Sequence, residues 1–387
     1  MKLKSIQSIK NLKNKKVLLR VDFNVPFKNG RIKDDFRIKA GLPTIKFLLS
    51  KGASIIILNH LGRPKGQVVA ELSNKPIAAR LSKLINRPVI QASGVIGPVV
   101  TQLTQKLSAG QILMLENVRF NDQEEKNGRK FAKNLAGLGN WYVNDAFAVC
   151  HRLGSSVSAI TEYLPSAAGF LLEQEISNLS KVLESPLRPK VAIIGGAKLE
   201  TKVKVLKNLL AKMDYVLMGG AIANNILKAM NYDVGQSLVD DSQLKLARQI
   251  LNNKLRVPID VVVAGQVSAT AKPQIKAVGL IKKHEIILDL GPETAQLYLE
   301  IIKSAKLVVW NGPLGYFEIP KYKKSSEQVA RGIASLKLFS VIGGGETVQM
   351  IKGLGLEKKF SFVSTGGGAM LEFLEGKMLP GIKPLIK

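Results

Sequence analysis

One cysteine, few acidic side chains and no long apolar run set the first limits on this protein. Cys150 has no partner for an internal disulfide, which excludes a scaffold held together by disulfides. No uninterrupted apolar stretch approaches the ~18 residues that a membrane-spanning helix needs. The basic segment 1–16 is followed by neither an apolar core nor a small-residue cleavage site, which argues against a signal peptide. We therefore expect a soluble, cytoplasmic protein.

Acidic residues are scarce relative to basic ones, 29 against 57, and the formal net charge is +28. Such a chain attracts polyanions, among them nucleic acid, acidic membrane surfaces and phosphorylated metabolites. The lysines and arginines are spread along the whole chain without an isolated basic tail, so a mixed, solvated surface also accounts for them. Net charge alone does not decide among these interpretations.

Short apolar segments alternate with helix-length segments along all 387 residues, a length that predicts two or three domains. The predicted strands are 17–22, 54–59, 111–116, 141–145, 190–195, 214–218, 259–263, 286–289, 306–310, 338–342 and 360–363. The predicted helices include 35–50, 74–86, 199–211, 220–231, 240–254 and 293–304. Strands that alternate with helices form parallel sheets covered on both faces, so the pattern predicts two doubly wound α/β domains. An apolar helical segment at 170–184, flanked by prolines, is the expected connector.

Glycine-rich turns follow several predicted strands of the second half. They are Gly195-Gly196-Ala197-Lys198, Gly219-Gly220-Ala221, Gly343-Gly344-Gly345-Glu346-Thr347 and Thr365-Gly366-Gly367-Gly368. Glycine lets the backbone approach a phosphate, and helix N-termini favour anions, so four such turns indicate a phosphorylated ligand. One such turn alone is explained equally well by tight packing. None fits the P-loop or the dinucleotide-binding fingerprint, which argues against a P-loop nucleotidase and a Rossmann dehydrogenase.

Polar and basic residues follow the predicted strands of the first half. They are Asp22, Asn24, His60, Arg63, Arg119, His151 and Arg152, with Arg37 at the start of the first helix. Taken singly, each arginine is an ordinary surface residue. Together, arginines at the ends of several parallel strands predict a site for a small, multiply charged anion.

Eleven longer motifs lie along the chain in one order. They are RVDFNVP (20–26), DDFRIKAGLPTI (34–45), HLGRPKG (60–66), LENVRF (115–120), VNDAF (143–147), YLPSAAGFLLEQE (163–175), GGAKLETK (195–202), GPET (291–294), VWNGPLGYFE (309–318), IGGGET (342–347) and STGGGAMLEFLEGKMLPG (364–381). With these motifs the chain resembles the phosphoglycerate kinases almost from end to end. The resemblance implies two doubly wound parallel-sheet (Rossmann-like) domains separated by a cleft and joined by a hinge helix. It implies a 3-phosphoglycerate-binding domain at 1–170, a connecting helix at 171–187 and a nucleotide-binding domain at 188–370, with the tail from about 371 to 387 packed back on the first domain.

The implied activity is that of a glycolytic kinase. A phosphoryl group would pass between 1,3-bisphosphoglycerate and Mg-ADP, giving 3-phosphoglycerate and ATP, by direct in-line transfer after domain closure. Mg²⁺ would be the cofactor, carried with ADP or ATP. We expect a monomer with these small-molecule substrates as its partners, and neither a specific nucleic acid nor a membrane.

Family roles carry over to the matching positions of this sequence. The 3-phosphoglycerate site would comprise Asp22, Phe23, Asn24, Arg37, His60, Leu61, Gly62, Arg63, Arg119, His151 and Arg152. The nucleotide would contact Lys198, Lys202, Gly219, Gly291, Asn311, Glu318, Gly344, Gly345, Glu346 and Thr347, with Glu346 also at the metal. The transfer itself would depend on Arg37, Lys198, Gly345 and Gly367.

The sequence also departs from the family pattern. Leu153-Gly154 stand where the family typically has Ala-His, and Glu346 stands where it usually has aspartate. Asn59 replaces a common serine, and Met370 replaces a small polar residue. The longer carboxylate at position 346 leaves the metal affinity and the rate open.

Two other hypotheses compete with the kinase. A nucleic-acid-binding protein would explain the charge of +28, but the sequence shows no RNP-type aromatic strand, helix-turn-helix or zinc finger. An inactive family member could act as a scaffold, but the retention of Arg37, Lys198, Lys202 and Glu318 argues against it. ATP formation from 1,3-bisphosphoglycerate would separate the three.

Overall fold

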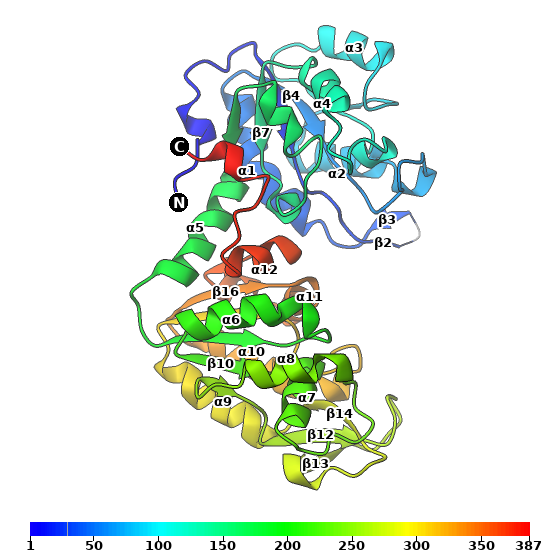
Figure 1. The fold of residues 1–387 in the computed structure, drawn as a ribbon. Helices are drawn as coiled ribbons and strands as arrows, with labels where there is room; N and C mark the ends of the chain where they lie inside the picture. The colour runs from blue at the N-terminus through cyan, green and yellow to red at the C-terminus, as the bar shows by residue number, and fades with distance from the viewer. Residues whose placement is uncertain (29) are drawn as a thin grey trace. The chain divides into compact units, whose positions relative to one another are not determined.

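The structure, a computed structural model, describes residues 1–28 and 30–387. Backbone contacts divide the chain into two compact units. Unit 1 comprises Met1–Ser177 and Met378–Lys387, and unit 2 comprises Asn178–Lys377. Each unit is built around its own parallel β-sheet with helices on its faces (Figure 1).

The described residues of unit 1 form a six-stranded sheet with the order β5-β6-β4-β1-β7-β8, and every neighbouring pair is parallel. Its strands are β1 (Lys16–Arg20), β4 (Ser54–Leu58), β5 (Val89–Gln91), β6 (Ile112–Met114), β7 (Trp141–Asn144) and β8 (Ser166–Ala168). Its helices are α1 (Phe36–Ser50), α2 (Lys75–Ile85), α3 (Pro98–Gln105), α4 (Arg129–Ala136) and the first part of α5 (Phe170–Glu184). A short antiparallel hairpin, β2 (Phe27–Lys28) and β3 (Arg31–Ile32), precedes α1.

The central strands are apolar throughout because both faces of the sheet are buried. In β1, Val17 and Leu19 join one core cluster with the inner faces of α1 and α2, whereas Leu18 joins the opposite cluster with α3 and α4. β4 alternates in the same way, with Ile55 on the first side and Ile56 on the second. The sheet of unit 1 is therefore sandwiched between two layers of helices, as the alternation of strands and helices predicts.

The described residues of unit 2 form a second six-stranded parallel sheet, with the order β11-β10-β9-β15-β16-β17. Its strands are β9 (Lys190–Ile194), β10 (Tyr215–Met218), β11 (Leu255–Arg256), β15 (Leu307–Asn311), β16 (Phe339–Gly343) and β17 (Phe362–Val363). Its helices are α6 (Val203–Lys212), α7 (Gly220–Ala229), α8 (Leu244–Gln249), α9 (Pro292–Ser304), α10 (Lys324–Ser335), α11 (Gly345–Gly353) and α12 (Gly368–Leu374). Apolar residues of α9, α10 and α11 share one core cluster with β9 and β15.

A small antiparallel sheet in unit 2 differs from the prediction. The segments predicted at 259–263 and 286–289 form β12 (Asp260–Ala264) and β14 (Ile286–Leu290), which pair with each other and with β13 (Gln274–Ala277) in antiparallel order. The chain between β12 and β14 contains β13 and one short 3₁₀ turn instead of a crossover helix. Without such a helix the chain reverses direction, and parallel pairing of these segments is lost.

Two further local differences are a shorter helix and short strands that were not predicted. These strands are β2, β3, β5, β8, β11 and β13. The helix predicted at 240–254 is reduced to α8, because a 3₁₀ turn precedes it and β11 follows.

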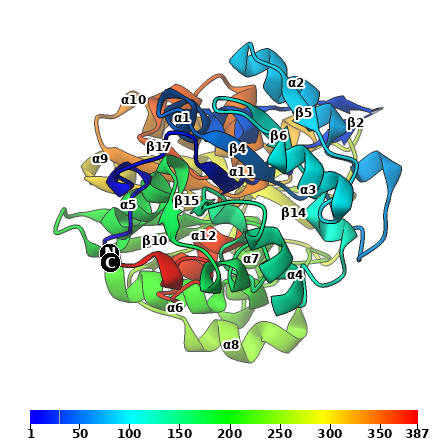
Figure 2. The ribbon, with the colours of Figure 1, turned by 90° about the horizontal axis from the view of Figure 1, so that it is seen from above.

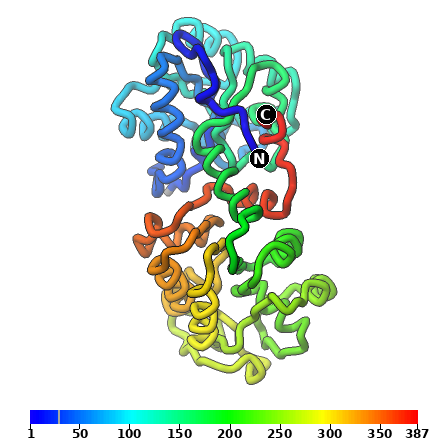
Figure 3. The backbone as a smooth tube through the Cα atoms, turned by 90° about the vertical axis from the view of Figure 1, so that its left-hand side faces the viewer, coloured from blue at the N-terminus to red at the C-terminus, as the bar shows by residue number. Residues whose placement is uncertain are grey.

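Both ends of the chain lie side by side in unit 1 (Figures 2 and 3), where Leu3 forms an antiparallel bridge with Ile386. Among the residues described, no helix has the length and apolar character needed to cross a membrane.

Candidate active site

The carboxyl ends of four neighbouring strands in unit 1 carry the polar side chains predicted from the sequence. Asp22, Phe23 and Asn24 follow β1, and His60 to Arg63 follow β4. Arg119 lies in a 3₁₀ turn after β6, and His151 and Arg152 lie beyond the 3₁₀ turn after β7. Because β6, β4, β1 and β7 are adjacent and parallel, these residues share one edge of the sheet.

Asp22 lies between Arg37 and His60 at this edge. Its buried carboxylate forms an ion pair with Arg37, which lies in the first turn of α1 and keeps about a third of its side chain exposed. The other carboxylate oxygen of Asp22 lies 3.7 Å from Nδ1 of His60. A ligand at this edge therefore meets an arginine whose orientation is already set by a buried carboxylate.

The surrounding loops are tied together by amide and guanidinium groups. The Asn24 side chain accepts a hydrogen bond from the backbone N–H of Gly62 (3.0 Å), and Nη1 of Arg119 donates to the Gly62 carbonyl (2.7 Å). Asn59 accepts from the Phe23 N–H (2.8 Å). The side chains of Phe23 and Leu61 belong to the core, so they support the loops from beneath.

Positive charge at this edge is concentrated in an arginine cluster comprising Arg37, Arg63, Arg119 and Arg152. Arg119 is buried and also contacts Glu125 (3.3 Å), whereas Arg63 and Arg152 are exposed. Nε of Arg152 donates to Nε2 of His151 (3.1 Å). Because the guanidiniums of this cluster outnumber the Asp22 and Glu125 carboxylates that they contact, the edge favours a multiply charged anion.

His60 is neutral in this setting. Burial lowers its pKa well below the usual value, and the charges of Arg20, Arg119, Arg37 and Arg152 lower it further. The positive charge of the site therefore belongs to the arginines, and the imidazole contributes hydrogen bonds without adding charge.

The glycine turns of unit 2 pack tightly against one another. A Cβ on Gly312, which has φ of +96°, would lie 2.2 Å from the carbonyl oxygen of Gly195, and a Cβ on Gly219 would lie 2.5 Å from Leu314. A Cβ on Gly291 would lie 2.1 Å from the carboxylate of Asp260. These glycines are required by the close approach of neighbouring chain segments, whatever ligand binds.

Gly345 and Gly367 behave differently. An added Cβ at either position would have no protein atom within 4 Å. Gly345 begins α11 and Gly367 precedes α12, so both lie where helical N–H groups are free to face an anion. The open space beside them is the geometry that a phosphate group approaching the backbone requires.

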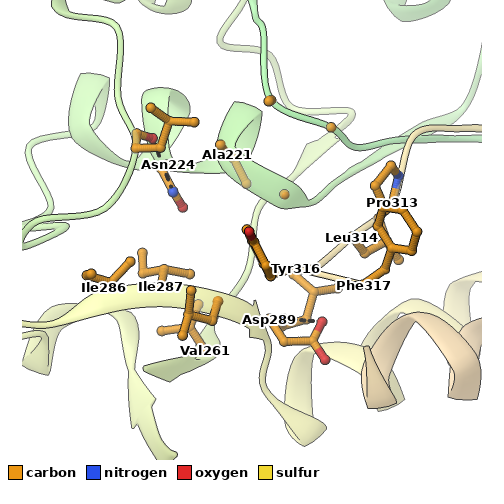
Figure 4. A pocket seen from close by; sticks show the side chains of 18 of the residues that line it. Ala221, Asn224, Val261, Ile286, Ile287, Asp289, Pro313, Leu314, Tyr316 and Phe317 are labelled. Atoms are coloured by element: carbon orange, nitrogen blue, oxygen red, sulfur yellow. Dashed lines mark hydrogen bonds between the residues drawn. The ribbon is translucent and has the colours of Figure 1, made fainter. Parts of the chain in front are cut away.

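A pocket of about 340 Å³ lies beside these turns in unit 2. Its lining includes Gly196, Ala197, Gly220, Ala221, Asn224, Leu238, Val261, Ile286, Ile287, Leu288, Asp289, Pro313, Leu314, Tyr316, Phe317, Glu318 and Glu346. Figure 4 shows Ala221 and Asn224 of α7 on one side and residues of β12 and β14 on the other, with Tyr316 between them. A mainly apolar slot with a few polar groups at its rim fits a flat heterocycle that carries a polar extension.

Several predicted nucleotide contacts are engaged within the protein. Nζ of buried Lys202 donates to the carbonyl oxygens of Gly195 (2.6 Å) and Asn311 (3.5 Å), which uses two of its three N–H donors. Burial lowers the pKa of Lys202 to about 8, against the opposing influence of Glu346. Thr347 is buried and its hydroxyl accepts from the Gly312 N–H (2.9 Å). These groups hold the turns in place.

Lys198, Glu318 and Glu346 are exposed instead. Glu318 and Glu346 line the pocket, and Glu346 lies in the first turn of α11. Within residues 1–28 and 30–387 no group of three or more metal-ligating side chains occurs. The Glu346 carboxylate, exposed in the same turn as Gly345, fits Mg²⁺ that arrives with phosphate oxygens as its other ligands, since Mg²⁺ commonly uses one or two carboxylates in this way.

Comparisons with known proteins bear on both sites. A profile described as phosphoglycerate kinase matches residues 6–377. A phosphoglycerate kinase of Moorella thermoacetica is 46% identical over 380 residues, covering 97% of each chain, and one of Chloroherpeton thalassium is 46% identical over 395 residues, covering 100% of this chain and 99% of the relative. The solved structure of phosphoglycerate kinase from Coxiella burnetii has a TM-score of 0.88 at 40% identity, covering 99% of each chain. The enzyme from Pyrococcus horikoshii has the same TM-score at 32% identity, covering 99% of this chain and 98% of the other.

The chain belongs to the phosphoglycerate kinase family. Membership in the phosphoglycerate kinases makes it a transferase, a kinase of glycolysis that acts on small-molecule substrates. The phosphoglycerate kinase family also implies a nucleotide substrate, generally taken with Mg²⁺.

The departures from the phosphoglycerate kinase pattern have local structural consequences. A Cβ on Gly154 would lie 3.3 Å from the carboxylate of Glu124, so a histidine here would require Glu124 to shift. Met370 is buried, with its sulfur 3.9 Å from Nδ2 of Asn311 and directly over Gly343. Met370 thus fills the space behind the turn that carries Glu346.

Sequence reasoning missed the apolar walls of the pocket. Tyr316 and Phe317 stand in the VWNGPLGYFE motif, but an apolar side chain carries no sign of whether it lines a core or a pocket. Arg20 was missed as well: it is the first residue of the RVDFNVP motif, but it lies within a predicted apolar strand and is 1% exposed. A buried arginine next to a predicted substrate histidine is visible only once the fold is known.

Proposed function

We propose that this enzyme transfers a phosphoryl group between 1,3-bisphosphoglycerate and Mg-ADP, giving 3-phosphoglycerate and ATP, by direct in-line transfer after closure of two domains. We place the domains at 1–170 and 188–370, with a connecting helix at 171–187 and a tail at about 371–387 that belongs with the first. The observation that carries the proposal is the arginine cluster on an edge held in place by Asp22.

For the first site we propose the substrate 3-phosphoglycerate or its acyl phosphate. Its phosphate and carboxylate groups together carry several negative charges, which the arginine cluster can neutralise with directed N–H donors. His60, neutral and buried, can donate one further hydrogen bond to an oxygen of the same ligand. Asn24 and Gly62 would set the position of the glycerate backbone through the loops that they join.

For the second site we propose ADP or ATP. The adenine ring would lie between α7 and the small antiparallel sheet, in the apolar slot, and the ribose would lie near Glu318. The phosphates would then extend toward Gly344, Gly345 and Glu346, where N–H groups and open space meet them. Lys198 is exposed in the turn after β9 and can reach a terminal phosphate.

The transfer step needs little covalent help from the protein. Arg37 and Lys198 would balance the charge on the equatorial oxygens of the migrating phosphoryl group, and the backbone at Gly345 and Gly367 would supply N–H donors. When bound, Mg²⁺ supplies further charge to the nucleotide phosphates, with Glu346 as its protein ligand. Since the two substrates would bind different domains, closure would bring them together and exclude water from the reacting groups.

A coupled assay of ATP formation from 1,3-bisphosphoglycerate and ADP tests the proposal. We expect Mg²⁺-dependent turnover that Arg37→Ala strongly reduces and that the surface variant Arg129→Ala leaves unchanged. No turnover by a folded protein that binds both ligands would indicate a scaffold. Salt-resistant, sequence-selective nucleic-acid binding without turnover would indicate a nucleic-acid-binding protein. We further propose a cytoplasmic monomer; sedimentation would test the oligomeric state.

A further inference from the structure

Arg20 is among the largest fully buried side chains of the described residues, at 1% exposure. It is the last residue of β1, two positions before Asp22. Its Nε donates to Oγ of Ser156 (2.8 Å), and its Nη1 donates to the carbonyls of Val21 and Leu58. Its Nη2 lies 3.3 Å from Nδ1 of His60. The guanidinium is thus fixed from three sides and directs its fourth contact at the imidazole.

The charge of Arg20 is balanced through a chain of buried groups. Oγ of Ser156 accepts from Arg20 and donates to Oε1 of Glu124 (2.6 Å), while the Ser156 N–H donates to Oε2 of the same carboxylate (2.9 Å). Ser156 and Glu124 are both buried. Burying an arginine and a glutamate is costly unless each is hydrogen-bonded, and here a continuous chain Glu124–Ser156–Arg20–His60 satisfies that condition.

This arrangement determines which imidazole nitrogen carries the proton. A guanidinium has five N–H donors and no acceptor, so the atom that faces it within hydrogen-bond distance must offer a lone pair. The competing neighbour is Oδ1 of Asp22, an acceptor at 3.7 Å, which is beyond hydrogen-bond distance. Nδ1 therefore accepts from Arg20, and the single proton of the neutral ring lies on Nε2.

We propose that Arg20 is a positioning residue that holds His60 as the neutral tautomer with its proton on Nε2, so that the ring presents one fixed donor to an oxygen of the substrate. The proposal rests on the function above only for the identity of that oxygen. The charged groups that face His60 are Arg20 of β1, Asp22 after β1, Arg37 of α1, Arg119 after β6 and Arg152 after β7. Four of these five are cations, so protonation of the ring is opposed from every packed element except the loop that carries Asp22.

The tautomer can be read directly by NMR, without substrate and without turnover. The chain contains three histidines, so ¹⁵N-histidine labelling gives three ring systems, which His151→Gln and His284→Gln assign. We expect the His60 Nδ1 to show the shift of an unprotonated ring nitrogen and Nε2 that of a protonated one, unchanged between about pH 5 and 8. A protonated Nδ1, or a charged ring at pH 7, would overturn the proposal even if the enzyme is fully active.

Variants then test the link to substrate binding. Arg20→Gln replaces a group that only donates by an amide that both donates and accepts, so both tautomers become allowed. We expect the KM for 3-phosphoglycerate to rise about tenfold, as for one lost hydrogen bond, and to become dependent on pH between about 5 and 8, with kcat little changed. Ser156→Ala keeps the guanidinium but removes one of its hydrogen-bond partners. We expect it to raise the KM for 3-phosphoglycerate roughly threefold, and it tests the proposal if Arg20→Gln does not fold. Arg129→Gln, an exposed arginine in the same unit, is the matched control.

If the folded Arg20→Gln or Ser156→Ala enzyme keeps the wild-type KM and pH profile, the positioning role is rejected. If the wild-type enzyme shows the expected tautomer but has no kinase activity, the proposed function fails while the tautomer assignment stands.

Discussion

The two units are built on similar parallel sheets, and each has a candidate site at the carboxyl ends of its strands, but the two sites differ in the groups that form them. In unit 1 the candidate site consists of side chains, chiefly the arginine cluster anchored by Asp22. In unit 2 it consists of backbone turns and apolar walls, with Glu318 and Glu346 at the rim of the pocket. The sheet provides the edge where loops converge, and the residues on those loops decide which ligand chemistry it can hold.

The two kinds of site should differ in how they fail. A site made of charged side chains should lose binding or rate when one charge is removed, while the fold survives. In a site made of glycine turns, substituting a glycine that touches a neighbouring segment should destabilise the fold. Substituting a glycine beside open space should reduce only the function. The following changes test this contrast, from the largest expected effect to the smallest.

Arg37→Ala should lower kcat on the order of 10³-fold while raising the KM for 3-phosphoglycerate much less. The proposed contact of Arg37 is with the migrating phosphoryl group, whose charge distribution is stabilised mainly in the transition state. Steady-state kinetics in the ATP-forming direction measure both constants. Arg37→Lys keeps a positive charge without the two-pronged guanidinium, and its kcat should lie between those of the wild type and Arg37→Ala. An unchanged kcat with a raised KM would assign Arg37 to ground-state binding.

Gly312→Ala and Gly345→Ala form a matched pair in unit 2. Gly312→Ala should lower the free energy of unfolding by about 3 kcal/mol, because φ is positive and the new methyl group meets the Gly195 carbonyl. Gly345→Ala should leave stability within ~0.5 kcal/mol but reduce turnover roughly 10- to 100-fold, because the methyl group enters the open space that we propose for the phosphate. Denaturant unfolding and kinetics on both variants check this. Full activity of Gly345→Ala would show that no ligand uses that space.

Glu346→Gln should weaken the Mg²⁺ dependence and slow turnover about tenfold, whereas Glu346→Asp should remain active. The carboxylate lies in the first turn of α11 at the pocket rim, where it can serve the metal or merely the helix N-terminus. Titration with Mg²⁺ at fixed ADP separates these roles. Equal activity and equal Mg²⁺ response in both variants would leave Glu346 only as a favourable charge at the helix end.

Raising the ionic strength from about 0.01 to 0.15 M should raise the KM for 3-phosphoglycerate several-fold, because the Debye length shortens from roughly 30 to 8 Å. The KM for ADP should rise less, since its proposed site holds the adenine by apolar contact. Turnover should change little. If both KM values rose equally, the contrast between a charged site and an apolar site would not govern binding.

The apolar pattern predicted the central strands because their burial is nearly complete. β1 and β4 sit between two helix layers, and continuous apolar runs such as SIIIL have few alternative explanations. β13 escaped prediction because its residues are mostly exposed and carry no apolar pattern. The antiparallel arrangement of β12 and β14 escaped it because strand direction depends on the connection between strands, which an apolar run does not encode.

The candidate site shows the same division. Position after a strand was enough to indicate Asp22, His60 and Arg119 as neighbours on one edge. It could not reveal that the Lys202 ammonium donates to backbone carbonyls, since one of these belongs to Asn311, 109 residues away in sequence. Nor could it reveal Arg20, because a lone arginine in an apolar strand shows no sign of the Ser156 and Glu124 that balance it.

The pairing of the two chain ends bears on the order in which the protein folds as it is synthesised. Leu3 pairs with Ile386, and the Gly381 N–H donates to the Cys150 carbonyl (2.9 Å), so unit 1 is complete only with residues 378–387. Those residues leave the ribosome after all of unit 2, which is continuous in sequence. Domains usually fold in the order of their synthesis. Unit 2 is complete in sequence before the last segment of unit 1 has been made, so a chain that ends at residue 377 would contain the whole of unit 2 and an incomplete unit 1.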